Sequence, residues 1–201
     1  GRVPQVLSVT SRLKDSLNCA IVGGICSPEI LSNILLSPSS KNDPSIREEV
    51  FFAVGEALSL LANSYLESGA DGIAILAPDG MPISDPLHTQ SLSSLPNILA
   101  HYEAFGAIIT RETSPAQIKS AADLGFDLIT GSTSSPEESI KSAQVSGIHF
   151  GLGIPSSILS SKKESIQTFV NSFPNNTLLS SEWTIPSSVS PETIHDLMGS
   201  L

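Results

Sequence analysis

The sequence predicts an α/β fold in which parallel strands alternate with helices. Six short apolar runs recur along the chain, and polar residues or glycine bound each of them. The runs occupy residues 19–24, 72–76, 107–110, 126–130, 148–153 and 177–181. A strand that is apolar throughout is typical of a parallel sheet with both faces covered. Six such strands with helices between them predict either an open sheet or one curled into a barrel, and the spacing alone does not distinguish the two.

Helix starts and stops separate these runs. Residues 27–29 (Ser-Pro-Glu) and 114–115 (Ser-Pro) each place a capping serine before a proline in the first turn. Gln117, three residues after the second of these serines, and the stretch 135–138 (Ser-Pro-Glu-Glu) predict capping boxes. The longest amphipathic segment spans 47–69 and closes on glycine. These signals place helices between the expected strands.

Size and charge limit the function classes. The chain has 201 residues and a mass of 21.1 kDa, which favours a single domain over residues 1–201. Its formal net charge is −10 and its estimated pI is 4.7. Nothing would offset the repulsion from phosphate groups, so neither nucleic acid nor an anionic membrane is expected as a partner.

Cysteine use and hydropathy point to a cytoplasmic protein. Cys19 and Cys26 are too few for a disulfide framework, and we expect two free, mostly buried thiols. No apolar run approaches the roughly 18 residues that span a bilayer. No charged-then-apolar signal segment opens the chain either.

Polar residues directly follow the third apolar run. Thr110 ends that run, and Arg111 and Glu112 follow it before the helix start at Ser114. In many α/β folds this position forms the rim of the active site. Arg111 would bind a substrate carboxylate or phosphate through its planar guanidinium, with Glu112 as base or partner. The alternative is a solvated loop pair worth well under ~1 kcal/mol.

Other strand exits contribute further candidates. Thr130, at the end of the fourth run, is with Thr110 a candidate for substrate binding. Asp79, in the loop after the second run, is either a general acid–base residue or only a turn residue. Glu182 and Trp183 follow the last run, where the indole ring would either stack on a flat ligand or fill the space of a metal and substrate. The filling role is favoured for the tryptophan.

The order and spacing of four segments carry a resemblance. They read "CAIVGGICSPEILSNIL", "LANSYLESGADGIAILAPDGMPIS", "AADLGFDLIT" and "LLSSEWTIPSSVSPETIHDLM". Together they resemble the uroporphyrinogen decarboxylase superfamily, which includes the decarboxylase and the zinc-dependent methylcobamide:coenzyme M methyltransferases. The likeness covers roughly residues 18–198 and implies a (β/α)₈ barrel.

The implied barrel is incomplete. A family barrel has eight strands, whereas the strands recognised here match the family's third to eighth. We therefore expect a TIM-barrel-like (β/α) domain of six units, incomplete or truncated. Such a piece leaves two open parallel edges, which natural proteins avoid exposing. Residues 4–9 (PQVLSV) would supply one edge strand, and a second chain would cover an edge as well, so a homo-oligomer is expected.

The positions to which the resemblance assigns chemistry are altered. The family's zinc-binding His-x-Cys positions fall on Ile108 and Thr110, and its last cysteine falls near Trp183. None of these is a soft zinc ligand, so zinc is not expected. The decarboxylase's aspartate falls near Ala77, with Asp79 two residues later.

The four histidines do not restore a metal site. His149 lies within an expected strand and would pack between layers, whereas His88, His101 and His195 lie on or beside expected helices and would face solvent. No two of them fall at metal-ligand spacing.

The resemblance leaves three functions open. The first is methyl transfer from a methylated cobamide to a small acceptor, with a corrinoid-carrying partner protein docked over the rim. The second is a non-enzymatic binding or scaffold paralogue. The third is a cofactor-free decarboxylase of tetrapyrrole carboxylates, which is weakened because the chain has only four arginines: Arg2, Arg12, Arg47 and Arg111. No cofactor is assigned to the chain itself.

Overall fold

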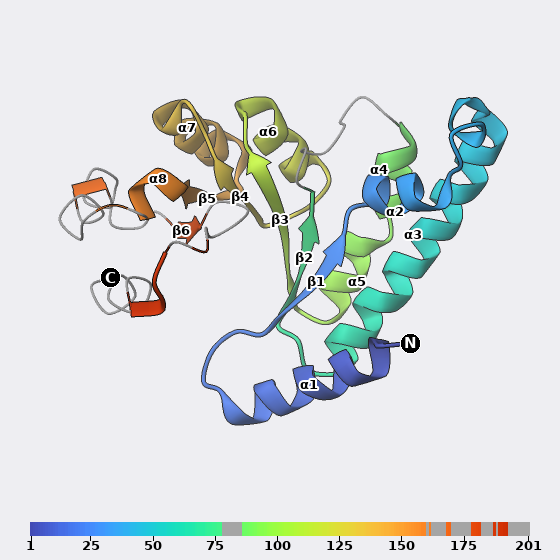
Figure 1. Ribbon diagram of the computed structural model, residues 1–201, viewed down its shortest axis with the longest axis horizontal. Coiled ribbons are helices and arrows are strands. Elements are labelled where there is room, and N and C mark those ends of the chain that lie inside the picture. The colour runs from blue at the N-terminus through green and yellow to red at the C-terminus, as the bar shows by residue number, and fades with distance from the viewer. Residues whose placement is uncertain are drawn as a thin grey trace.

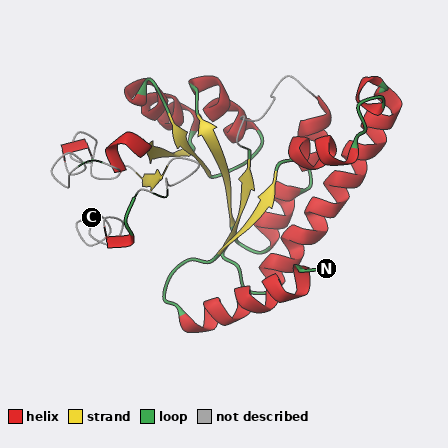
Figure 2. Ribbon diagram, viewed as in Figure 1, coloured by secondary structure: helices red, strands yellow, loops and turns green. Residues whose placement is uncertain are grey.

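Six parallel strands form one sheet in the computed structural model, which describes residues 1–77, 86–159, 161, 168–169, 178–181, 187 and 189–192. The strands are β1 (Val22–Cys26), β2 (Gly72–Leu76), β3 (Phe105–Glu112), β4 (Leu128–Ser132), β5 (His149–Ile154) and β6 (Leu178–Ser181). All six predicted runs therefore form strands (Figure 2). The first begins later than predicted, at Val22 instead of residue 19.

The order of the strands decides between the two architectures that the spacing of the apolar runs left open, in favour of the incomplete barrel that the resemblance implied. In a doubly wound sheet the strand order reverses at a switch point, whereas here each strand pairs with its neighbours in sequence, from β1 to β6. Right-handed crossovers that always advance in one direction bring the connecting helices to the same side of the sheet. Within the described residues β1 and β6 do not pair with each other, so the fold is an open, incomplete (β/α) barrel (Figure 1).

Helices connect the strands on the outer side of the sheet. Their bounds are α1 (Val3–Ser16), α2 (Pro28–Leu35), α3 (Pro44–Glu67), α4 (Pro86–Leu92), α5 (Leu95–His101), α6 (Pro115–Asp123), α7 (Pro136–Ser146) and α8 (Ser156–Leu159), with a 3-10 turn at Ser40–Asn42. The predicted capping box is present at Ser114 and Gln117. The one predicted at Ser135 is wrong: its side chain makes no capping hydrogen bond, and its backbone N–H instead donates to the hydroxyl of Thr133.

Alternate strand residues build the core against these helices. Successive side chains on a strand point to opposite faces, and the helix-facing set is almost fully buried. Its centre consists of Ile25, Ile73, Ile75, Ile108, Ile129 and Leu152. They belong to one core cluster with the buried face of α3, whose main strand contacts are with β1 and β2, and this burial accounts for the apolar stripe of that helix. Each isoleucine or leucine buried in this way stabilises the fold by about 1.5–3 kcal/mol.

The opposite face of the sheet, called the inner face below, would line the interior of a closed barrel. It is built largely from small residues, among them Gly24, Ala74 and Ala107. At its two open edges Val22 and Leu178 remain 41% and 48% exposed. The inner face is therefore apolar and partly open to solvent.

Three helices end in the same way before a strand. At the ends of α3, α6 and α7, the residues Gly69, Gly125 and Gly147 have φ angles of 93°, 82° and 70°. The N–H of the following residue bonds back to the carbonyl five residues earlier, for example Phe126 to Ala121. This Schellman geometry requires a left-handed residue, which glycine adopts at little cost. It turns the chain directly into the next strand.

An aspartate fixes the entry of two strands. Asp71, before β2, accepts the backbone N–H of Ile21 on its carboxylate at 2.8 Å. Asp127, before β4, accepts the N–H of Gly106 in the same way, also at 2.8 Å. These residues belong to the "GAD" and "GFD" stretches that carried the family resemblance. Both therefore act at the N-terminal end of the sheet, where they join neighbouring strands.

The N-terminal segment is a helix, so the expected edge strand at residues 4–9 is wrong. Helix α1 lies across the N-terminal end of the sheet (Figure 1). The Ser11 hydroxyl donates to the carbonyl of Ser68, and the Lys14 ammonium pairs with Asp71 at 2.5 Å. As a helix this segment satisfies its own backbone hydrogen bonds, and it leaves the edge of β1 unpaired among the described strands.

Both cysteines are free, but their expected burial is only partly met. Cys19 is exposed, because it lies in the loop before β1 instead of within the strand. Cys26 is half-buried at the end of that strand. Among the described residues no helix is long and apolar enough to cross a membrane.

Candidate active-site rim

The C-terminal ends of the six strands meet at one edge of the sheet, called the rim below. Parallel strands present their carboxyl ends together, and this is the edge at which (β/α) barrels place their chemistry. On β1 and β2 the last residues are Cys26 and Leu76. On β3 and β4 they are Glu112 and Ser132, which gives the rim its polar part.

A bulge interrupts β3 at the rim. Ile109 lies opposite Thr130, but the next pair is Glu112 with Ser132, so Thr110 and Arg111 share the single partner position of Gly131. The extra residue shifts the alternation of side chains by one. Glu112 thereby shares a face with Ser132 and Thr130, whereas a regular strand would have put it on the helix side with Ile108.

Thr110 serves the packing of the sheet. It is 1% exposed, and its hydroxyl donates to the Thr130 carbonyl at 3.2 Å. The Thr113 hydroxyl lies 2.7 Å away and fills the remaining hydrogen-bonding position. A Cβ on Gly131 would come within 2.4 and 2.5 Å of these two hydroxyl oxygens, so only glycine fits. Thr110 therefore lies on the helix side, turned away from the inner face.

Thr130 belongs to the opposite face. Its hydroxyl lies 2.5 Å from that of Ser180 on β6, across the intervening strand β5. The intervening residue is Gly151, whose missing Cβ would otherwise approach the Thr130 Cβ and hydroxyl to 2.9 Å. Thr130 and Ser180 thus form a hydroxyl pair on the inner face close to the rim. Ser180 was not singled out from the sequence, because its link to Thr130 depends on the order of the strands.

Arg111 and Glu112 are both exposed at the end of β3. Neither side chain makes an ion pair or hydrogen bond with any residue in the described part of the chain. The Arg111 carbonyl accepts the Ser132 hydroxyl at 2.6 Å, which fixes the backbone here. Both groups remain available to a ligand, as the functional hypothesis requires. The other predicted site residues, Asp79, Glu182 and Trp183, lie outside the described residues.

The positions that would hold zinc do not fit that metal. Ile108 is fully buried in the core and has no ligating atom. The Thr110 hydroxyl is engaged by Thr113 and the Thr130 carbonyl. Zinc requires thiolate, imidazole or carboxylate ligands, usually in a tetrahedral set. Nowhere in the described ranges do three such side chains come close enough to bind a metal ion.

Two of the histidine expectations are wrong. His88 is buried at 4% exposure, with its ring 4.8 Å from that of Phe51, because α4 packs against α2 and α3. It borders a cavity of about 270 Å³ that Arg47 and Lys41 also line. His149 is exposed, since the first position of β5 faces the open inner side. Neither short stretch of sequence indicated whether other elements would cover its histidine.

No family model matches the chain, and no curated protein matches it. Among solved structures, the chain is similar to a methyltransferase from Methanosarcina mazei, with a TM-score of 0.69 and 19% sequence identity. The similarity covers 99% of this chain and 64% of that one, so the chain spans a little under two thirds of the matched structure. Together with the strand order, this establishes the TIM-barrel-like fold that the sequence predicted.

Proposed function

We propose that the chain belongs to the uroporphyrinogen decarboxylase superfamily and takes part in methyl transfer, as a relative of the corrinoid-dependent methyltransferases. The observation that carries this proposal is the similarity in fold to a methyltransferase along 99% of the chain. The four segments that resemble the superfamily support it independently, since they come from the sequence. We assign the reaction to the rim formed by β3, β4 and β6, in the cytoplasm.

The rim residues have distinct roles in this proposal. A methylated cobamide, carried by a partner protein docked over the rim, supplies an electrophilic methyl group. Arg111 binds an anionic group of the acceptor through its planar guanidinium. Glu112 would take the proton from the acceptor's nucleophilic atom, whose electron pair would form the new bond to the methyl carbon while the carbon–cobalt bond breaks and leaves its electron pair on the cobalt. Thr130 and Ser180 hold a polar atom of the acceptor against the apolar inner face.

One observation favours a second candidate, a non-enzymatic paralogue. The zinc positions carry Ile108 and Thr110, which perform packing roles in this chain. A protein that kept the fold and lost the metal would have this arrangement.

The decarboxylase is disfavoured, because Arg2 and Arg12 are at α1 and Arg47 borders the cavity between helices. Only Arg111 is on a strand at the rim.

The decisive experiment follows the absorbance of methylcobalamin mixed with the protein and a panel of small thiols, amines and alcohols. We expect acceptor-dependent demethylation, and a loss of at least 100-fold in the double variant Arg111→Ala/Glu112→Ala. A matched control, Lys119→Ala/Asp123→Ala, replaces a cation and a carboxylate on exposed positions of α6 and should leave the rate unchanged.

Three results would change the assignment. An unchanged rate in the Arg111/Glu112 variant would remove these residues from the site. Binding of methylcobalamin without turnover, or no binding at all, would favour the non-enzymatic paralogue. Stoichiometric zinc by elemental analysis would show that the assignment of ligand positions is wrong.

A further inference from the structure

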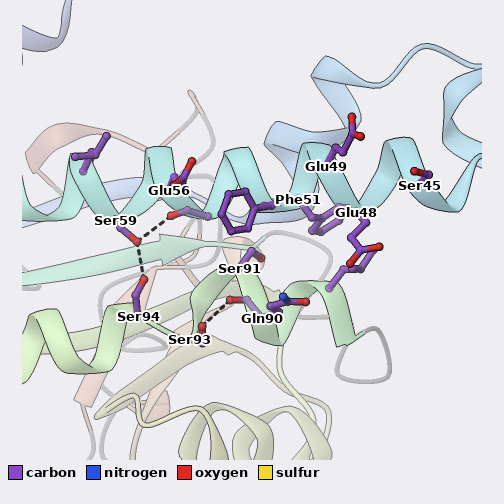
Figure 3. A pocket seen from close by; sticks show the side chains of 14 residues that line it. Ser45, Glu48, Glu49, Phe51, Glu56, Ser59, Gln90, Ser91, Ser93 and Ser94 are labelled. Carbon is purple, nitrogen blue, oxygen red and sulfur yellow. Dashed lines mark hydrogen bonds between the residues drawn. The ribbon is translucent and has the colours of Figure 1, made fainter.

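The outer side of α3 carries a groove that no part of the described chain fills. It has a volume of about 860 Å³ and lies between α3 and the segment formed by α4 and α5 (Figure 3). At its floor the helices approach closely, because a Cβ on Gly55 would come within 2.9 Å of the Ser91 carbonyl oxygen. The Ser59 and Ser94 hydroxyls, 2.6 Å apart, hold the two sides together.

The groove is acidic and apolar at the same time. Phe52 and Leu60 line it and are 62% and 69% exposed, which is unusual for side chains of this size. Glu48, Glu49 and Glu56 lie along the same wall, and no lysine or arginine is among the lining residues. Arg47, the single cation of α3, lines the smaller cavity on another side of the helix. A ligand for this groove must offer apolar surface and positive charge.

Helix α1 of the same chain offers both. Val6, Val9, Leu13 and Leu17 follow one another at helical spacing at and just beyond this helix, and each is 40–51% exposed. Arg2 and Arg12 are exposed at the same helix. The contacts through Ser11 and Lys14 fix α1 to the body and leave this stripe turned outward.

The two surfaces match in length and in the spacing of charge. The stripe from Arg2 to Leu17, which includes one residue on either side of α1, and the groove wall from Ser45 to Leu60 each cover 16 residues, or about 22 Å at the rise of a helix. The two arginines are about 15 Å apart along α1. The acidic groups at Glu48 and Glu56 are about 12 Å apart along α3, a difference that long side chains absorb.

We propose that two copies of this chain form a closed dimer in which α1 of each copy lies in the α3–α4 groove of the other. The reciprocal exchange uses the stripe and the groove of each chain once and closes on a two-fold axis, so neither of these surfaces remains free to extend a polymer. The apolar stripe supplies affinity by burial, and the arginine–glutamate pairs supply orientation. This dimer does not depend on the methyl-transfer proposal.

The test is the mass in solution, by light scattering and sedimentation at 100 mM salt. The wild-type protein should have twice the chain mass of 21.1 kDa at micromolar concentration. Glu48→Lys/Glu56→Lys in the groove and Arg2→Glu/Arg12→Glu at α1 should each raise the dissociation constant at least 30-fold. Leu13→Asp should do the same. The controls Asp123→Lys and Val145→Asp change an exposed charge and an exposed apolar residue on α6 and α7 and should leave the dimer intact.

Mixing the two charge-reversed variants gives the sharpest test. In the mixed dimer the acidic α1 of the Arg2→Glu/Arg12→Glu copy lies in the basic groove of the Glu48→Lys/Glu56→Lys copy. In the other contact, a wild-type α1 lies in a wild-type groove, so its charges are unchanged. The heterodimer should form with close to wild-type affinity although each variant alone dimerises at least 30-fold more weakly. A wild-type monomer at 100 µM, a dimer unaffected by the groove and α1 variants, or open polymers instead of a dimer would each overturn the proposal.

Discussion

The two ends of the sheet differ in what their polar residues do. At the N-terminal end, Asp71 and Asp127 accept backbone N–H groups from the neighbouring strand and so join strand to strand. At the C-terminal end, the hydroxyls of Thr130 and Ser180 bond to each other on the inner face, and Arg111 and Glu112 are exposed without partners among the described residues. In (β/α) barrels the first end serves stability and the second serves function. The stretches that reveal the fold and those that would reveal the chemistry therefore lie at opposite ends.

The largest effect on stability should come from the C-terminal end, at Gly131. A methyl group there would overlap the hydroxyls of Thr110 and Thr113, so Gly131→Ala should lower the free energy of unfolding by about 2 kcal/mol or more. Gly24→Ala is the matched control, because its Cβ would meet only Leu76, at 3.8 Å. Urea unfolding monitored by circular dichroism measures both. Equal stability of the two variants would mean that the rim of β3 and β4 is loosely packed.

A smaller effect is expected at the N-terminal end, at Asp127. Asp127→Ala removes the acceptor of the Gly106 N–H and should cost about 1–2 kcal/mol without changing activity at the rim. Asp123→Ala changes an exposed aspartate of α6 and should cost much less. If Asp127→Ala lowers turnover more than it lowers the fraction of folded protein, the N-terminal end of the sheet serves function as well as stability, and the contrast between the two ends is wrong.

The smallest effect is a pH dependence at Asp71. The hydrogen bond from Lys14, followed by that from the Ile21 N–H, holds the pKa of this carboxyl below its ordinary value of 3.8. The folded state therefore binds the proton less readily than the unfolded chain. The stabilisation is complete above the unfolded pKa and is lost as the pH falls through the lower folded pKa.

Unfolding measured from pH 6 down to pH 2 tests this dependence. The wild-type protein should lose stability over the acidic part of the range more steeply than Asp71→Asn, whose amide does not titrate there. Asp15→Asn, an exposed aspartate on α1, should follow the wild-type curve. Parallel curves for the wild type and Asp71→Asn would show that the Lys14 contact does not persist in solution.

The periodic features of the fold were readable from the sequence because they are local. Strand positions follow from continuous apolar runs, and the end of α3 follows from Gly69, since only a left-handed residue completes that turn. Helix α1 was missed because "PQVLSV" is a short apolar run, for which strand and helix patterns are hard to tell apart. In the structure its side chains contact Ser68 and Asp71, more than fifty residues away, and the local pattern carries no sign of these contacts.

The candidate site was readable only in part. Arg111 and Glu112 could be placed at a strand end from the sequence, but the bulge that turns Glu112 to the inner face was not predicted. Thr110 and Thr130 looked equivalent, since both end an apolar run. The structure separates them: the first packs on the helix side and the second pairs with Ser180 on the inner face. One shift in register decides between these faces, and no local pattern records it.

The sequence by itself determined the α/β class, the six strands, the capped helices and an acidic surface, because backbone propensity, apolar periodicity and charge are properties of neighbouring residues. The family resemblance already implied an incomplete barrel, and the strand order bears it out. Only the tertiary structure decided which hydroxyls meet across β5, and that an acidic groove beside α3 and an apolar stripe on α1 are both left unfilled by the described residues. Each of these depends on contacts between residues far apart in the chain. Such contacts are set by how the helices and strands pack together, and local sequence carries little record of them.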